Sequence, residues 1–334
     1  MPLTLDRRAG LEPARREPAS GPEPARSRAA DDSEGTRRET RVGEQTTMSE
    51  PRRLDTPLLA RAPRTAEEAF GPAPAGEDPI LGELAAAALA AAVAGATFAA
   101  ERLGAQRTGV GTKSSATDMV SEVDRGSEAL IAAVLAELRP HDGLLGEEGA
   151  ERQGSTGVRW VVDPLDGTTN YLFGLPSWSV SVAAEIYGRP VVGVVVDPSL
   201  DETWSAVDGR GARCNGATRR VAEGRSTLAT ALVATGFGYD AERRSHQAEV
   251  LRSVLPSVRD IRRFGSAAID LCWVAGGRYD AFYELGLNPW DAAAGSVICR
   301  EAGGVVETLP GGVLLAATPG LAGPLASLLR SAGA

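Results

Sequence analysis

The chain has 334 residues, 43% of them apolar, which is enough for one large domain or two modest ones with a substantial core. A net charge of −9, from 44 acidic and 35 basic residues, argues against a nucleic-acid-binding protein. Three cysteines without a CxxC pair and two distant histidines do not favour a disulfide framework, a zinc site or a Ser-His-Asp triad. Metal or acid–base chemistry must therefore rely on carboxylates.

The first part of the chain differs in composition from the rest. Residues 1–77 are rich in Pro, Arg, Glu and Ala, and we predict a disordered, charged tail because such a segment buries little apolar surface. Mixed charges favour a solvated tail over a docking arm. Met48 is a candidate for the true start of the protein. The N-terminus lacks the apolar core of a secretory signal, so we expect a cytoplasmic protein.

Residues 78–334 are predicted to form the folded domain, with subdomains of about 78–222 and 223–334. An Ala-rich helix is expected over 79–103. Its apolar run, 85–100, is shorter than the about 20 residues that span a bilayer, so we expect a packed helix and no membrane contact. A second helix is predicted to begin at an N-cap at Thr117-Asp118 and to end near residue 138.

Strands are predicted next, first in a block and later alternating with helices. A buried strand is expected at 159–163, and the alternating pattern of 177–186 predicts a half-buried one. Segments 190–198 and 202–209 should pair as in a hairpin. The remaining expected elements are helices over 241–255, 266–276, 290–301 and 320–331, and strands over 259–265, 279–284 and 303–309. This order predicts a mixed α/β fold.

The segment Asp163-Pro164-Leu165-Asp166-Gly167-Thr168-Thr169 follows the strand at 159–163. Two carboxylates three positions apart on one turn would face one cavity, and they are the oxygen ligands that Mg²⁺ prefers. The helix predicted to start at Gly167 would offer free N–H groups to phosphate oxygens. The alternative is a capped turn with two solvated aspartates.

Further acidic segments favour the metal-site interpretation. Glu147 lies in a Gly-Glu-Glu-Gly turn that we expect to be flexible, and Asp291 follows Pro-Trp at the start of a predicted helix. Each has an ordinary alternative, a surface loop for the first and an N-cap for the second. Lys113, the only lysine, and the acids from Asp118 to Asp124 add further polar groups.

These segments together resemble a known family. GTKSSATDMVSEVD, GEE, WVVDPLDGTTNY, RRFGSAAIDLC and NPWDAAAG, in this order, are similar to the inositol monophosphatase family from about residue 80 to the C-terminus. The resemblance implies a mixed α+β fold, a layered αβαβα sandwich of the inositol monophosphatase and fructose-bisphosphatase type. It also implies a homodimer, sensitivity to lithium and a requirement for two or three Mg²⁺ ions.

The resemblance also assigns residues. It implies metal ligands at Glu147, Asp163, the Leu165 carbonyl, Asp166, Thr169 and Asp291. It implies catalytic roles for Glu147, Thr169, Asp124 and Lys113, with Thr169 orienting the attacking water. It implies phosphate or substrate contacts at Asp166, Gly167, Thr168, Gly265, Ser266, Ala267, Glu284 and Asp291. Phe173 and Asn288 depart from the family pattern and are expected near the substrate rim.

The expected function is the hydrolysis of an inositol monophosphate or a similar small polyol phosphate. Histidinol phosphate, a sugar bisphosphate and a phosphoadenosine nucleotide remain alternatives of the same chemistry. An alternative of another class is a regulatory binding protein that reuses the fold. The cluster Arg259, Arg262 and Arg263 is either a surface or dimer feature or a guide for phosphate.

Overall fold

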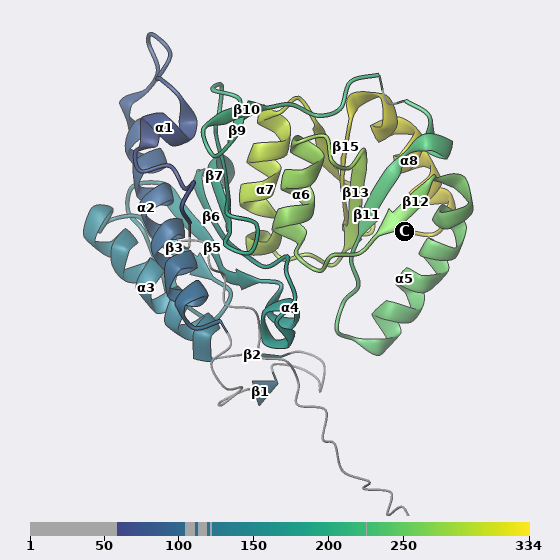
Figure 1. Ribbon diagram of the computed structural model, residues 1–334, viewed down its shortest axis with the longest axis horizontal. Helices are drawn as coiled ribbons and strands as arrows, with labels where there is room; N and C mark the ends of the chain where they lie inside the picture. The colour runs from purple at the N-terminus through teal and green to yellow at the C-terminus, as the bar shows by residue number, and fades with distance from the viewer. Residues whose placement is uncertain (1–58, 104–110, 113–118, 121, 225) are drawn as a thin grey trace, which may run out of the picture. The chain divides into compact units, whose positions relative to one another are not determined.

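The computed structural model describes residues 59–103, 111–112, 119–120, 122–224 and 226–334, all within the unit Glu50–Ala334. Two sheets alternate with helices in the order helix, sheet, helix, sheet, helix (Figure 1). Helices α2 and α3 cover the outer face of the first sheet, and α6 and α7 lie between the two sheets. The predicted αβαβα sandwich is therefore confirmed.

The first sheet contains the block of predicted strands. Among the described residues its order is β10 (Ala217–Arg219), β9 (Ala212–Cys214), β8 (Glu202–Val207), β7 (Arg189–Asp197), β6 (Ser179–Ile186), β5 (Val158–Asp166), β3 (Gly143–Gly146) and β4 (Glu151–Arg152). In this sheet β3 and β5 pair in parallel, and the other neighbours are antiparallel. The predicted hairpin is observed as β7 and β8.

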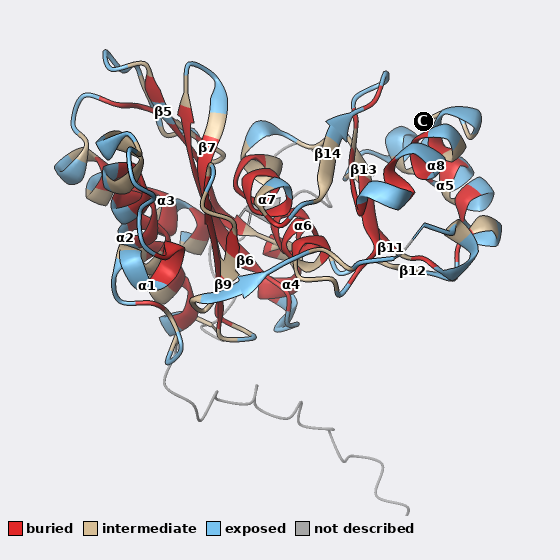
Figure 2. Ribbon diagram, turned by 90° about the horizontal axis from the view of Figure 1, so that it is seen from above, coloured by how far each residue is buried: buried red, intermediate tan, exposed pale blue. Residues whose placement is uncertain are grey.

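The prediction of a half-buried strand at 177–186 was wrong. Almost every residue of β6 is buried, because helices cover both faces of the sheet. Figure 2 shows this burial in red along β5, β6 and β7 and on α6 and α7. The polar members of the pattern, Ser179 and Ser181, face the inner helices and make hydrogen bonds there, which allows their burial.

The second sheet comes from the last third of the chain. Its order in the described part is β12 (Asp260–Arg262), β11 (Leu232–Thr235), β13 (Ala281–Leu285), β15 (Val313–Ala317) and β14 (Val305–Thr308). Strand β11 runs parallel to β12 and β13, and the other pairs are antiparallel. The sequence interpretation missed β15 and β3. The two sheets divide the chain between Arg219 and Leu232.

The helices lie close to their predicted positions. Their bounds are α1 Ala66–Phe70, α2 Pro79–Glu101, α3 Glu122–Leu138, α4 Thr168–Phe173, α5 Ala241–Val254, α6 Ala267–Ala275, α7 Pro289–Glu301 and α8 Pro319–Ser331. Two 3-10 turns lie at Leu228–Thr230 and Leu255–Ser257, and two short strands, β1 (Gly111–Thr112) and β2 (Met119–Val120), pair with each other. The helix predicted to start from an N-cap at Thr117-Asp118 begins later, at Glu122, because Met119–Val120 form β2; the two N-cap residues themselves lie outside the described residues.

Helix α2 is long and apolar enough, by length and composition, to cross a membrane. In this fold it is a core helix: it packs on β6, β7 and α3, and its small side chains are buried from Leu84 to Ala100. Alanine permits this close approach and favours the helix at the same time. The packed helix expected over 79–103 is therefore confirmed.

The predicted tail boundary at residue 77 was wrong, because residues 59–77 belong to the folded domain. Phe70 at the end of α1 is 1% exposed and lies in the first core with Leu84. The Ser205 hydroxyl donates to the Ala69 carbonyl at 2.6 Å, and Arg210 forms a buried ion pair with Glu77. These contacts are distant in sequence, so the polar composition of the segment did not reveal them.

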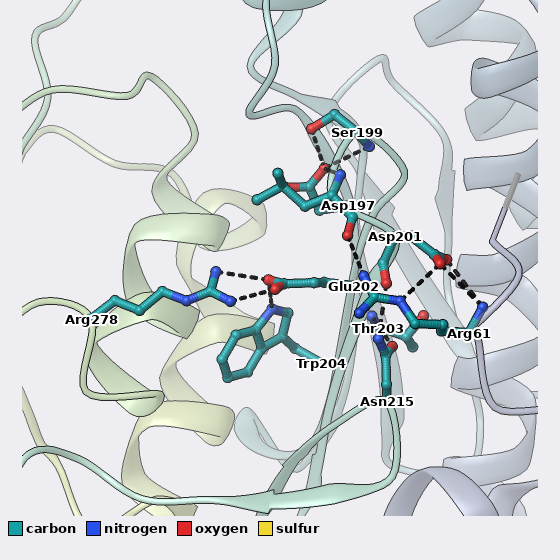
Figure 3. Close-up of polar contacts among 10 residues, drawn as sticks. Arg61, Asp197, Ser199, Asp201, Glu202, Thr203, Trp204, Asn215 and Arg278 are labelled. Carbon is teal, nitrogen blue, oxygen red and sulfur yellow. Dashed lines mark hydrogen bonds and ion pairs between the residues drawn. The ribbon is translucent and has the colours of Figure 1, made fainter. Parts of the chain in front are cut away.

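An ion pair with aromatic neighbours connects the two sheets. Arg278, before β13, donates to the carboxylate of Glu202 on β8, and one of these bonds measures 2.9 Å (Figure 3). The indole of Trp204 donates to the same carboxylate at 3.1 Å, and the Arg278 guanidinium lies 5.1 Å from the Trp273 ring centre. These contacts help to fix the position of one sheet against the other.

Replacing the buried side chain that anchors α1 tests this correction. Phe70→Ala should lower the free energy of unfolding by about 3 kcal/mol, because the lost ring leaves a cavity in the first core. Denaturant unfolding of the purified chain measures the effect. Leu255→Ala, at a 49% exposed position, is the control and should change stability by less than about 0.5 kcal/mol. An unchanged stability for Phe70→Ala would mean that residues 59–77 do not belong to the domain.

Candidate active site

A cavity of about 350 Å³ opens where the end of β5 and the turn after β3 meet loops of the second sheet. Residues far apart in sequence meet there, as the resemblance implied. The predicted site residues that line it are Glu147, Asp163, Leu165, Asp166, Gly167, Thr168, Gly265, Ala267, Glu284 and Asp291. Its size is within the range that holds small organic ligands.

The turn after β5 presents two aspartates through an irregular strand end. The pairing of β5 with β6 shifts register between Asp163 and Asp166, so both carboxylates reach the cavity. The Leu165 amide donates to Asp163 at 3.0 Å, and the Thr168 hydroxyl donates to the Leu165 carbonyl at 3.0 Å. Gly167 has φ of 87°, and a Cβ there would lie 2.9 Å from the Ser177 carbonyl, so glycine is required.

Asp166 is held by the start of α6. Its Oδ2 accepts the Ser266 hydroxyl at 2.7 Å and the Ala268 amide at 2.8 Å. Ser266 is 1% exposed and does not line the cavity, so the predicted substrate contact was wrong for this residue. It is the N-cap of α6 and it orients Asp166. The Gly167 amide also bonds to Asp166, and a phosphate would compete for that N–H group.

Glu147 lies in the turn between β3 and β4, which a buried helix residue fixes. The carboxylate of Glu128 on α3 accepts the amides of Glu148 at 2.8 Å and Ala150 at 2.8 Å. A Cβ at Gly146 would collide with that carboxylate. The turn that was expected to be flexible is thus bound on both sides of Glu147. The preceding residue, Ser127, donates to the Pro164 carbonyl at 3.0 Å, so α3 contacts both acidic turns.

Asp291 is the third residue of α7 and not its N-cap. Asn288 is the N-cap, and its backbone amide donates to Asp291 Oδ2 at 2.6 Å. This reciprocal contact fixes the rotamer of Asp291 beside the cavity, which Asn288 also lines. The expected rim position is confirmed for Asn288. Phe173 is 53% exposed at the end of α4 and does not line the cavity.

The carboxylates in the cavity perturb one another. Burial raises the pKa of Asp163 well above its usual range, and the charges of Glu147, Asp166 and Asp291 raise it further. Burial raises the pKa of Asp166 to about 6, and burial with the charge of Asp166 raises that of Asp291 to about 8. Glu284 is affected in the same way, with a pKa of about 7. The site therefore concentrates negative charge out of water.

These residues fit a divalent cation by their chemistry. Hard carboxylate oxygens gather in one cavity, their pKa values show the mutual repulsion, and a 2+ charge would relieve it. Within the described part of the chain, no three acidic, histidine or cysteine side chains already form a closed ligand set.

Other predicted residues lie beside the cavity. Thr169 is in α4 and directly follows Thr168, which lines the cavity. Asp124 is buried in the first turn of α3 and does not line the cavity, so its role beside Thr169 stays a prediction. Lys113 lies outside the described residues.

Sequence reasoning missed several residues of this site. Tyr239 and Arg243 line the cavity. Glu128 holds the turn that carries Glu147 by accepting the Glu148 amide. Arg263 lines it too, and it was named only as part of a basic cluster. The acid four residues after Asp124 was the available signal for Glu128, because that spacing places both on one helix face. A Gly-Phe-Gly-Tyr turn before an Asp N-cap was the signal for Tyr239.

The raised pKa values predict that the metal-free protein loses stability as pH rises. Asp166 and Asp291 shift from an ordinary 3.8 to about 6 and 8, so the folded state keeps protons that the unfolded state has released. The contribution of these two groups to the free energy of unfolding is complete below pH 3.8, and it is lost as pH rises through 6 and 8. Melting temperatures in EDTA should therefore decline over this window. Mg²⁺ should flatten the decline, and so should Asp291→Asn at its upper end. A decline that is identical with and without Mg²⁺ would contradict the metal site.

The support of the Glu147 turn by Glu128 predicts an effect on metal affinity. Glu128→Gln turns an N–H donor toward one of the two amides, so the turn should shift and Mg²⁺ affinity should fall by about tenfold. Calorimetric titration with Mg²⁺ measures it. Glu137→Gln, at an exposed position on the same helix, is the matched control and should bind as the unaltered protein does. Equal affinity in both variants would show that the turn does not depend on Glu128.

Comparison with known proteins agrees with this geometry. A model of the inositol monophosphatase family matches residues 81–332. The chain is 44% identical over 243 residues to the inositol-1-monophosphatase SuhB of Mycobacterium tuberculosis, covering 69% of this chain and 84% of that protein. It is 41% identical over 203 residues to the Nus factor SuhB of Escherichia coli, covering 60% and 76%.

A solved structure shows the same fold. The crystal structure of the extragenic suppressor protein suhB from Bartonella henselae superposes with a TM-score of 0.69 and 38% identity, over 73% of this chain and 97% of that one. The family match covers both sheets and every carboxylate of the cavity. The chain belongs to the inositol monophosphatase family.

Proposed function

We propose that this protein is a Mg²⁺-dependent phosphomonoesterase that hydrolyses inositol monophosphate, or a closely similar polyol phosphate, to the alcohol and inorganic phosphate. The observation that carries the proposal is the set of four carboxylates, Glu147, Asp163, Asp166 and Asp291, on one cavity beside the Gly167-Thr168 turn. The family membership supports the reaction class.

Different residues of the cavity would contact the cations, the phosphate and the attacking water. Asp163, Asp166 and Asp291 would hold the cations with Glu147, and a bound cation would favour the ionised forms of these carboxyl groups. When bound, Mg²⁺ neutralises the phosphate charge and makes water easier to deprotonate. The Gly167 amide would exchange its bond to Asp166 for a phosphate oxygen. The Thr169 hydroxyl would orient the attacking water by accepting or donating one hydrogen bond.

Recognition of the alcohol would fall to the opposite side of the cavity. Glu284 lines the cavity, and its carboxylate lies against Gly236. A side chain at position 236 would collide with that carboxylate. When it is ionised, a carboxylate with a pKa of about 7 accepts hydrogen bonds from hydroxyl groups, which suits a substrate ring that carries several of them. Gly265 and Ala267 leave room for that ring because they have little or no side chain.

A sugar bisphosphate is the second candidate substrate, and two arginines favour it. Arg243 and Arg263 are the basic residues among the described ones that line the cavity. The guanidinium of Arg263 lies against Gly265, and the carbonyl of Gly265 lies close to Gly167. The guanidinium of Arg243 lies against Gly286. A second phosphate would meet a positive charge there, although the same groups would also attract a monophosphate.

A regulatory role is the candidate of another class. It is supported by the name Nus factor SuhB, which relatives such as the 41% identical Escherichia coli protein carry. A regulatory role does not account for the acidic cavity, because a surface for protein contact does not need four carboxylates gathered in one cavity. The enzyme proposal therefore explains more of the observed site.

A substrate panel tests the proposal. Phosphate release by the full chain should be fastest with inositol monophosphate, slower with histidinol phosphate, a sugar bisphosphate and a phosphoadenosine nucleotide. It should need Mg²⁺, stop with EDTA and fall with millimolar lithium, because each treatment empties or perturbs the carboxylate site. Asp291→Asn should abolish turnover while circular dichroism shows a folded protein.

Each outcome of the panel discriminates. Fastest release from the bisphosphate, with a loss specific to that substrate in Arg243→Ala, would replace the first candidate with the second. Inactivity on every ester with Mg²⁺, together with recovery of transcription proteins in a pull-down, would favour the regulatory role. A fully active Asp291→Asn variant would contradict the ligand assignment.

A further inference from the structure

Two loops that form the second-sheet side of the cavity leave neighbouring strands at the same end of the sheet. Strands β11 and β13 pair in parallel, with Thr235 beside Tyr283, and the loops 236–240 and 286–288 follow their ends. Every residue of both loops lines the cavity. Glu284, which would accept the hydroxyl groups of the alcohol, lies at the end of β13. The separation of the two loops therefore sets the width of this side of the cavity.

A buried side chain of helix α5 joins the two loops from behind. Gln247 is 6% exposed and does not line the active-site cavity. Its amide oxygen accepts the Gly238 N–H of the first loop at 2.9 Å. Its amide nitrogen donates at 3.2 Å to the carbonyl of Leu285, the residue from which the second loop starts. A small cavity that Gln247 lines shares Gly236 and Leu285 with the active-site cavity, so Gln247 lies directly behind the wall.

This pair of bonds needs a side chain with both a donor and an acceptor. Gly238 offers an N–H group and Leu285 offers a carbonyl, and the Gln247 amide matches both. A carboxylate at this position would lack the donor, and an apolar side chain would lack the donor and the acceptor. Because buried polar groups without partners are costly, the amide holds the two loops at a fixed separation.

Arg243, one turn earlier on α5, lies against the same two loops. A Cβ at Gly238 would lie 2.8 Å from the Cδ atom of Arg243, and a Cβ at Gly286 would lie 2.7 Å from a guanidinium nitrogen. Residues four apart lie on one face of a helix, so α5 contacts both loops at two successive turns. Arg243 reaches the active-site cavity itself, and Gln247 supports the wall behind it.

We propose that Gln247 is a positioning residue for substrate specificity: it fixes the separation of the two loops and so favours an alcohol that fills the space between them. The inference rests on the proposed function. A rigid polyol ring would contact both loops and Glu284 at once, and loops that are already in place need no ordering when it binds. A small acyclic alcohol would contact less of this side, so its binding would depend mainly on the acidic cluster and the Gly167-Thr168 turn.

The test compares two phosphate esters in variants of the full chain. Gln247→Met keeps the approximate size of the side chain and removes both hydrogen bonds. The ratio of kcat/KM for inositol monophosphate to that for glycerol 2-phosphate should fall about tenfold, as expected for two lost hydrogen bonds, mainly through KM for the ring substrate. Mg²⁺ affinity by calorimetry should stay unchanged, because the Asn288 amide still holds Asp291. Gln247→Glu should lower the ratio too, because a carboxylate repels the Leu285 carbonyl.

Val254→Ala, on the same helix, is the matched control for a loss of stability. Val254 is buried in the apolar core that α5 and α8 form with the second sheet, and it lines neither cavity. Its truncation should therefore lower the melting temperature and leave the ratio unchanged.

The outcomes separate this inference from the proposed function. An active protein whose ratio is unchanged in Gln247→Met, or whose rates fall equally for both esters, would overturn the positioning role and leave the proposed function standing. A fall in Mg²⁺ affinity that accounts for the whole loss would do the same. An unaltered protein that is inactive on both esters with Mg²⁺ would overturn both.

Discussion

The structure depends on one constraint: several carboxylates that repel one another are kept in the same cavity. Burial and mutual charge hold the pKa values of Asp163, Asp166 and Asp291 above their ordinary range, so the arrangement costs stability in the absence of a cation. Such a cost persists only where the surrounding structure imposes it. The other contacts of the site hold these carboxylates together in the cavity.

Three of the acidic groups are oriented by named neighbours. Ser266 and the Ala268 amide hold Asp166, the Asn288 amide holds Asp291, and Glu128 holds the turn that carries Glu147. These neighbours come from the starts of α6 and α7 and from α3, and all three helices pack on the first sheet. The layered fold thus converts ordinary helix starts into supports for a charged cavity.

The second sheet supplies the other side of the cavity with a different chemistry. Strand β13 provides Glu284, α5 provides Arg243 and the loop after β11 provides Tyr239, so a carboxylate, a guanidinium and a phenol line this side of the cavity. Hydrogen bonds from α5 to the loop after β11 keep this side in place relative to its own sheet. Under the proposed function, the groups that would contact the alcohol therefore lie on other elements than those that would hold the cation.

The sequence alone indicated most of the helices and strands and the acidic motifs, because helix and strand periodicity and the Asp163-to-Thr169 motif are local patterns. The layered fold followed from the resemblance of those motifs to a known family. It did not determine the burial of both faces of β6, the inclusion of residues 59–77 or the role of Ser266, since each depends on contacts between segments distant in the chain. Glu128 and Tyr239 were missed for the same reason. Only tertiary packing, in which α3 reaches the turn after β3 and the loop after β11 lines the same cavity as the turn after β5, brings these side chains together.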